Sequence, residues 1–111
     1  MPPSPLELLK GTLDVLILKT LTAGPMHGYA VSRWIRERTE GTLGVEDAAL
    51  YQALHRLERQ DLVSSEWGQS ENNRRAKFYR LTRKGRKRLV ADDQVWRRYA
   101  DAVYRVLDGE T

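Results

Sequence analysis

The sequence predicts a mostly α-helical protein with a small β-hairpin, an α+β fold class, and three observations support this prediction. Apolar residues recur at helical spacing in three segments before residue 61. Two β-prone runs follow at residues 62–67 and 76–81, separated by a polar stretch rich in turn-forming residues. Helical spacing returns after residue 82, so the expected order is three helices, a hairpin and a long final helix.

The first helix is expected to begin at Ser4 and Pro5. Ser4 and Glu7 form a capping pattern, and proline is favoured at the first helical position. Leucine and isoleucine then recur at three- and four-residue steps until Gly24-Pro25 ends the pattern. Gly11 lies inside this stretch and indicates a bend.

The second and third helices have separable inward and outward faces. The second is expected from His27 to about Glu40, with inward residues Tyr29, Val31, Trp34 and Ile35. Asp47 is expected to cap the third, which runs to about Gln60. At 100° per residue its apolar face holds Leu50, Ala53, Leu54 and Leu57. Its polar face holds Ala48, Ala49, Gln52, His55, Arg56 and Arg59, with Tyr51 on a flank.

The hairpin is expected to have strands at Leu62–Trp67 and Ala76–Leu81, joined by a long tip at Gly68–Arg75. Two tryptophans, Trp34 on the second helix and Trp67 on the first strand, are assigned to packing.

Thr82 is a favourable N-cap for the last helix, which is expected to end near Asp108. An apolar stripe on this helix has the spacing of a two-stranded coiled coil and contains Leu89, Trp96, Tyr99, Val103 and Val106.

Positive charge is concentrated in one part of the chain. Nine Lys or Arg residues occupy the fifteen positions from Arg74 to Arg88, with no acid among them. Such a concentration is typical of a surface that neutralises phosphate, and the amide, imidazole and guanidinium groups of the third helix can hydrogen-bond base edges. A merely solvated surface is the alternative interpretation of the same charges.

Composition argues against several other functions. The chain has no cysteine and only two histidines, so disulfides, thiolate chemistry and metal binding are not expected. No catalytic motif is present, and we expect neither an enzyme nor a cofactor. No apolar run reaches the roughly 18 residues of a membrane span, and the first residues carry no targeting signal. We therefore expect a cytoplasmic protein.

The expected order of elements is that of a winged helix-turn-helix domain, here residues 1–82, followed by a C-terminal dimerisation helix, residues 83–111. Four strings carry a more specific resemblance: Leu9–Leu13, Gly24–Tyr29, Leu50–Glu58 and Tyr79–Gly85. In this order and spacing they resemble the PadR family of transcriptional regulators over nearly the whole chain. The single helix after the hairpin is similar to the branch of that family with the smallest dimerisation element.

The resemblance implies a homodimeric, mostly repressing, DNA-binding protein, in some members released by phenolic acids or lipophilic drugs. Two places depart from the family pattern. Ala48-Ala49 replaces the frequent Gly-Ser, which removes a hydroxyl that would touch phosphate. Gln52 replaces the usual proline and adds a donor and an acceptor able to read adenine.

These arguments give two candidate sets, expected to serve a palindromic operator and a homodimer. The DNA-binding set is Ala49, Tyr51, Gln52, His55, Arg56, Arg59, Arg74, Arg75, Lys77 and Lys10. The dimerisation set, which includes an alternative effector pocket near Trp96, is Leu9, Leu13, Leu89, Trp96, Tyr99, Val103, Val106 and Leu107. Packing and ordinary surface polarity are the alternatives for single residues. A winged-helix module that binds a protein partner is the alternative for the whole chain.

Overall fold

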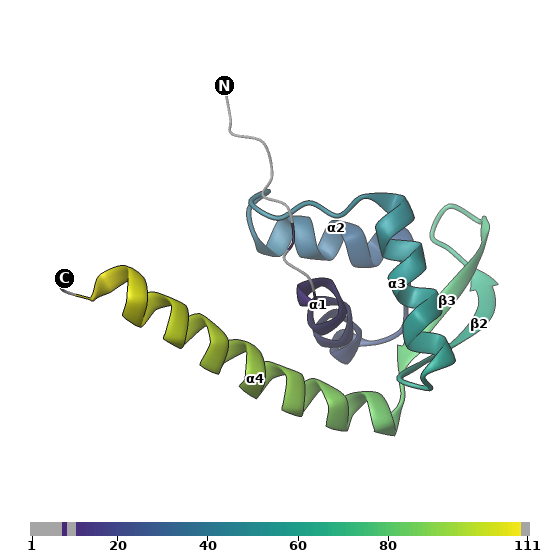
Figure 1. The fold of residues 1–111 in the computed structure, drawn as a ribbon. Helices are drawn as coiled ribbons and strands as arrows, with labels where there is room; N and C mark the ends of the chain where they lie inside the picture. The colour runs from purple at the N-terminus through teal and green to yellow at the C-terminus, as the bar shows by residue number, and fades with distance from the viewer. Residues whose placement is uncertain (1–7, 9–10, 110–111) are drawn as a thin grey trace.

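The structure, a computed structural model, describes Leu8 and residues 11–109. Its elements are α1 (Thr12–Thr20), a short 3-10 helix (Leu21–Ala23), β1 (Met26–His27), α2 (Gly28–Arg38), α3 (Asp47–Arg59), β2 (Val63–Gln69), β3 (Arg75–Leu81) and α4 (Arg83–Asp108). Helices α1 to α3 gather beside the β2–β3 hairpin, called the wing below, and α4 extends away from them (Figure 1). This arrangement confirms the predicted α+β fold.

The sheet has one strand more than the sequence predicted. It is antiparallel with the order β1-β3-β2, and Met26 and His27 of β1 pair with Tyr79 and Phe78 of β3. The sequence indicated only a turn before α2, because two residues are too few to display an alternating pattern. The His27 Nδ1 atom accepts a hydrogen bond from the amide of Ala30 at 3.2 Å, so His27 also caps α2.

The first described helix begins later than predicted. Gly11 has a φ of 86° and is the N-cap of α1, so it precedes the helix and does not bend it. Leu8 belongs to no helix or strand. The expected continuous helix through these positions was wrong, because a left-handed residue cannot continue an α-helix and glycine adopts that conformation readily. The predicted start at Ser4 and Pro5 lies outside the described residues.

The wing is paired further toward its tip than predicted. Register runs from Val63 opposite Leu81 to Gln69 opposite Arg75, which leaves only residues 70–74 as the tip. The predicted eight-residue tip was therefore too long. Turn-forming residue types do not prevent pairing where two strands are already in register, and Gly68 pairs with Ala76.

One apolar core lies between α1, α2, α3 and the inner face of the sheet. Its buried members are Ile17, Leu18, Leu21, Val31, Ile35, Leu50, Ala53, Leu54, Leu57, Leu62, Val63, Tyr79 and Leu81. The predicted inward face of α3 is confirmed. The expected cap at Asp47 was wrong, because Glu46 occupies the N-cap position without a side-chain hydrogen bond and Asp47 lies in the first turn.

The burial of three aromatic side chains can be compared with the sequence predictions. Trp34 is partly buried and packs against the core, as predicted. Tyr29 and Trp67 are 58% and 60% exposed, so the inward assignment of Tyr29 was wrong and Trp67 does not pack in the core. Both rings were placed by their apolar residue type alone, whereas each of them lies under an arginine.

Helix α4 is fixed at its start and along its first half. The Thr82 hydroxyl accepts a hydrogen bond from the amide of Gly85 at 2.9 Å, which confirms the predicted cap. Leu89 packs against the core, and the Trp96 indole donates to the Thr12 hydroxyl at 3.2 Å. The later part of the helix projects beyond α1 (Figure 1).

The buried Tyr79 gives the fold a specific dependence on alkaline pH. Burial raises the pKa of its hydroxyl above the ordinary value of 10.0, and the Glu58 carboxylate and Tyr51 add to this rise. A raised pKa in the folded state favours the neutral form, so this contribution to stability is complete below about pH 10 and is lost as pH rises through the folded pKa.

We therefore expect one of the five tyrosines to ionise late in an ultraviolet absorbance titration of the folded protein. Tyr79→Phe should remove this late phase, and Glu58→Gln should move it to lower pH by only part of the shift because burial is the larger cause. A late phase that survives in Tyr79→Phe would contradict this assignment.

Candidate nucleic-acid interface

The outward face of α3 is exposed along its length, as the sequence predicted. Ala49, Gln52, His55, Arg56 and Arg59 are all exposed. Tyr51 is 43% exposed, and its ring and hydroxyl lie against Gly28 of α2. The helix thus presents hydrogen-bonding groups of four chemical kinds, namely hydroxyl, carboxamide, imidazole and guanidinium.

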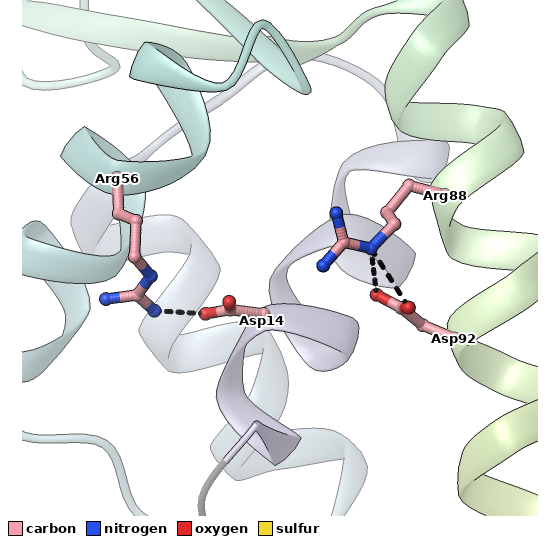
Figure 2. A network of polar contacts seen from close by, with 4 residues as sticks. All are labelled: Asp14, Arg56, Arg88 and Asp92. Atoms are coloured by element: carbon pink, nitrogen blue, oxygen red, sulfur yellow. Dashed lines mark hydrogen bonds and ion pairs between the residues drawn. The ribbon is translucent and has the colours of Figure 1, made fainter.

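Arg56 is held on one flank of this surface. Its Nη2 atom pairs with the Asp14 carboxylate of α1 at 2.5 Å, and the Arg56 side chain remains 44% exposed. Figure 2 shows Asp14 between Arg56 of α3 and Arg88 of α4, where Arg88 donates to both oxygens of Asp92 at 3.0 and 3.1 Å. In the free protein Arg56 therefore links α3 to α1, and a base contact would require it to leave or share Asp14.

The opposite flank of α3 is joined to the wing by Glu58. Its carboxylate accepts a hydrogen bond from the Ser65 hydroxyl and lies 3.7 Å from the Lys77 Nζ atom. Lys77 is half-buried and its ammonium lies 6.0 Å from the centre of the Tyr79 ring. The strand alternation that places Lys77 beside Tyr79 thus turns it toward α3.

A groove of about 810 Å³ separates the wing from α2 and α3. Tyr51 and His55 line it from α3, and Arg74, Arg75 and Lys77 line it from the wing. The structure therefore brings together five predicted residues that are separated by up to 26 positions in the sequence.

Sequence reasoning missed three side chains of the same groove. Tyr29 and Arg33 line it from α2, and Trp67 lines it from β2. Trp67 lies opposite Lys77 in the register, so strand alternation was a signal for its position. No comparable signal existed for Arg33, because its place depends on how α2 packs beside the sheet.

The basic run at the start of α4 is only partly available to a ligand. Lys84 donates through Nζ to the carbonyl of Gln60 at 3.0 Å, which satisfies the C-terminal end of α3. Arg88 is bonded to Asp92. Arg83 and Arg86 are exposed. The charge run noticed in the sequence therefore combines structural contacts with a free cationic surface.

The predicted dimerisation set divides into two groups. Leu13 and Leu89 pack against the core of their own chain. The remaining described members are exposed apolar side chains along α4, and these are Trp96, Tyr99, Val103, Val106 and Leu107. Lys10 and Leu9 lie outside the described residues.

Two further features concern only the part of the chain that the structure describes. Among Leu8 and residues 11–109, no group of three or more His, Cys, Asp or Glu residues is arranged to hold a metal ion. No helix in the same part is both long and apolar enough to cross a membrane.

The fold and the exposed cationic surface define a winged-helix transcriptional regulator that binds DNA. Residues 17–91 match the transcriptional regulator PadR-like family, and the chain belongs to that family. The resemblance carried by the four sequence strings is thereby confirmed.

Solved structures agree with this assignment. A transcriptional regulator from Clostridium thermocellum has a TM-score of 0.79 and 29% identity, covering 86% of this chain and 90% of its own. A PadR family transcription regulator from Clostridium difficile has a TM-score of 0.75 and 30% identity, with coverages of 87% and 99%. A PadR family regulator from Eggerthella lenta has a TM-score of 0.77 and 31% identity, with coverages of 91% and 86%.

Proposed function

We propose that the chain is a cytoplasmic homodimeric repressor that binds a palindromic operator. Each copy would place α3 in a major groove and the wing over the flanking minor groove, and repression would follow from occlusion of the promoter. The observation that carries this proposal is the exposed face of α3 beside a groove lined by four basic residues and one acidic residue. Phosphate contacts there would orient α3, whose side chains would read the bases.

The proposed division of labour places DNA binding in residues 1–82 and dimerisation in residues 83–111. Exposed apolar side chains on α4 support the second assignment, because Tyr99 is 59% and Val106 81% exposed in the single chain. Apolar side chains repeated at coiled-coil spacing are stabilised when a second helix covers them.

Release by a small aromatic or lipophilic effector is part of the same proposal. Trp96 lines two cavities between α1 and α4, of about 520 and 540 Å³. The second has mostly apolar lining from residues such as Val15, Leu16 and Leu89, and its charged lining residues are Lys19, Asp93 and Arg97. Such a lining suits a flat apolar molecule with a polar end.

Gln52 is expected to determine sequence preference. It is exposed near the middle of the α3 surface, and a glutamine amide can pair with the N6 and N7 edge of adenine. Gln52→Ala should change the preference between operator variants by about 1 to 3 kcal/mol at the contacted position. Competition binding with single-base operator variants measures this change.

Gln94→Ala is the matched control, because Gln94 is a solvent-exposed glutamine away from both ends of α4. It should leave the order of preference unchanged. If Gln52→Ala and Gln94→Ala rank the operator variants alike, Gln52 does not read a base.

Mobility-shift titration with fragments from upstream of the chain's own gene tests the function as a whole. We expect binding whose log K falls with log salt by about 0.9 for each phosphate contacted. A steep fall supports a DNA-binding regulator. Absence of a shifted band in dilute buffer would instead favour a winged-helix module that binds a protein partner.

A further inference from the structure

Two arginines of the groove between α2 and the wing are each stacked on an exposed aromatic ring. The guanidinium carbon of Arg75 lies 4.7 Å from the centre of the Trp67 ring, and that of Arg33 lies 5.6 Å from the centre of the Tyr29 ring. Both rings are more than half exposed, so neither is held there by burial in the core.

The two stacked pairs come from separate elements and meet around one groove. Tyr29 and Arg33 are one turn apart on α2, and Trp67 and Arg75 are on β2 and β3 of the wing. All four residues line the groove that Tyr51 and His55 line from α3. The cationic surface of the wing is thereby continued onto α2, which sequence analysis had left out of the DNA-binding set.

Stacking orients a guanidinium group without neutralising its charge. The aromatic face attracts the cation, whereas the in-plane N–H donors remain directed outward and can bind phosphate oxygens. The acids nearby compete weakly: the Arg33 Nε atom lies 3.8 Å from Glu37, whose side chain is 70% exposed, and Glu71 is the acid that lines the groove. Glu58, which faces the same region, already pairs with Lys77.

We propose that Arg33 and Arg75 bind the phosphodiester backbone of a DNA duplex from the two sides of this groove, and that Tyr29 and Trp67 are positioning residues for them. This inference rests on the proposed DNA-binding function. It adds α2 to the interface and assigns a role to two exposed rings that the core does not use.

Arg33→Ala is compared with Arg36→Ala to test the contact from α2. Arg36 is an exposed arginine on the same helix that does not line the groove. Binding is measured across salt on two duplexes of equal length, one from upstream of the chain's own gene and one of arbitrary sequence. In the proposed dimer, Arg33→Ala should lower the salt slope by about 1.8, or 0.9 for each copy, and should weaken binding about 25- to 100-fold near 0.1 M salt on both duplexes.

Trp67→Ala and Trp67→Tyr test the positioning role, because alanine removes the aromatic face and tyrosine keeps one. Trp67→Ala should weaken binding about two- to fivefold on both duplexes, and Trp67→Tyr should restore most of the affinity. A purely structural role for Trp67 would instead lower the melting temperature of Trp67→Ala in parallel with its affinity. Circular dichroism on all four variants detects such a loss of fold.

The outcomes separate this inference from the function on which it rests. If the unmodified chain shows no salt-dependent binding, both proposals fail. If the unmodified chain binds and Arg33→Ala matches Arg36→Ala in slope and affinity, the contact from α2 is overturned while the proposed function stands. If Trp67→Tyr binds as weakly as Trp67→Ala, the positioning role of the ring is overturned.

Discussion

Gly85→Ala is expected to destabilise the protein by about 3 kcal/mol or more, at the upper end of the cost of overpacking. Gly85 is a buried residue in the first turn of α4. A Cβ atom there would lie 2.0 Å from the carbonyl oxygen of Leu62 and 2.7 Å from Cδ1 of Leu81. The Leu62 carbonyl is fixed by hydrogen bonds from both the amide and the hydroxyl of Thr82, so it cannot move aside cheaply. Urea unfolding followed by circular dichroism measures the loss.

Lys87→Ala is the control for this prediction. It places an alanine at an exposed position two residues further along the same helix, where we expect a change within about 0.5 kcal/mol. Equal stability of Gly85→Ala and the unmodified chain would show that α4 does not begin in contact with the wing.

The double variant Tyr99→Glu with Val103→Glu is expected to abolish the proposed dimer. Both side chains are exposed on the apolar stripe of α4. Carboxylates there would be buried in the dimer interface beside the carboxylates of the second copy, which is unfavourable because the charges would be unpaired and removed from water. In a dimer, binding of one half-site places the second copy beside the other half-site, which raises the overall affinity. A monomer lacks this effect, so operator affinity should fall by about 10²- to 10⁴-fold. Sedimentation equilibrium at micromolar concentration and mobility shift measure the two effects.

Tyr104→Glu provides the matched control, because Tyr104 is 61% exposed on α4 but lies off the coiled-coil stripe. It should remain dimeric and bind the operator normally. A double variant that stays dimeric would place the interface elsewhere, and a monomeric double variant with undiminished affinity would remove the need for a dimer.

Features that depend on local sequence were predictable. The buried and exposed faces of α3 follow from a single helical period, and the Thr82 cap follows from one hydroxyl before an apolar repeat. The late start of α1 also depends on a local feature, the positive φ of Gly11. The sequence does not show this backbone conformation, and the leucine spacing on both sides of Gly11 favoured a continuous helix.

Features that depend on tertiary neighbours were not predictable. Arg56 contacts Asp14 across 42 positions, and nothing in either helix alone indicates this partner. Tyr29 was placed inside by its residue type, although at 100° per residue it lies about 160° from Val31 and about 120° from Ile35, so the helical period itself indicated the exposure that the structure shows. The candidate site was therefore correct in its elements and incomplete in its residues.

Footprinting upstream of the chain's own gene tests the central claim most directly. Two copies joined through α4 should protect two half-sites whose centres are about 10 base pairs, or a multiple of that distance, apart. Both should lose protection together in the Tyr99→Glu, Val103→Glu variant. A single protected block that persists in this variant, or no protection at any salt concentration, would contradict the account.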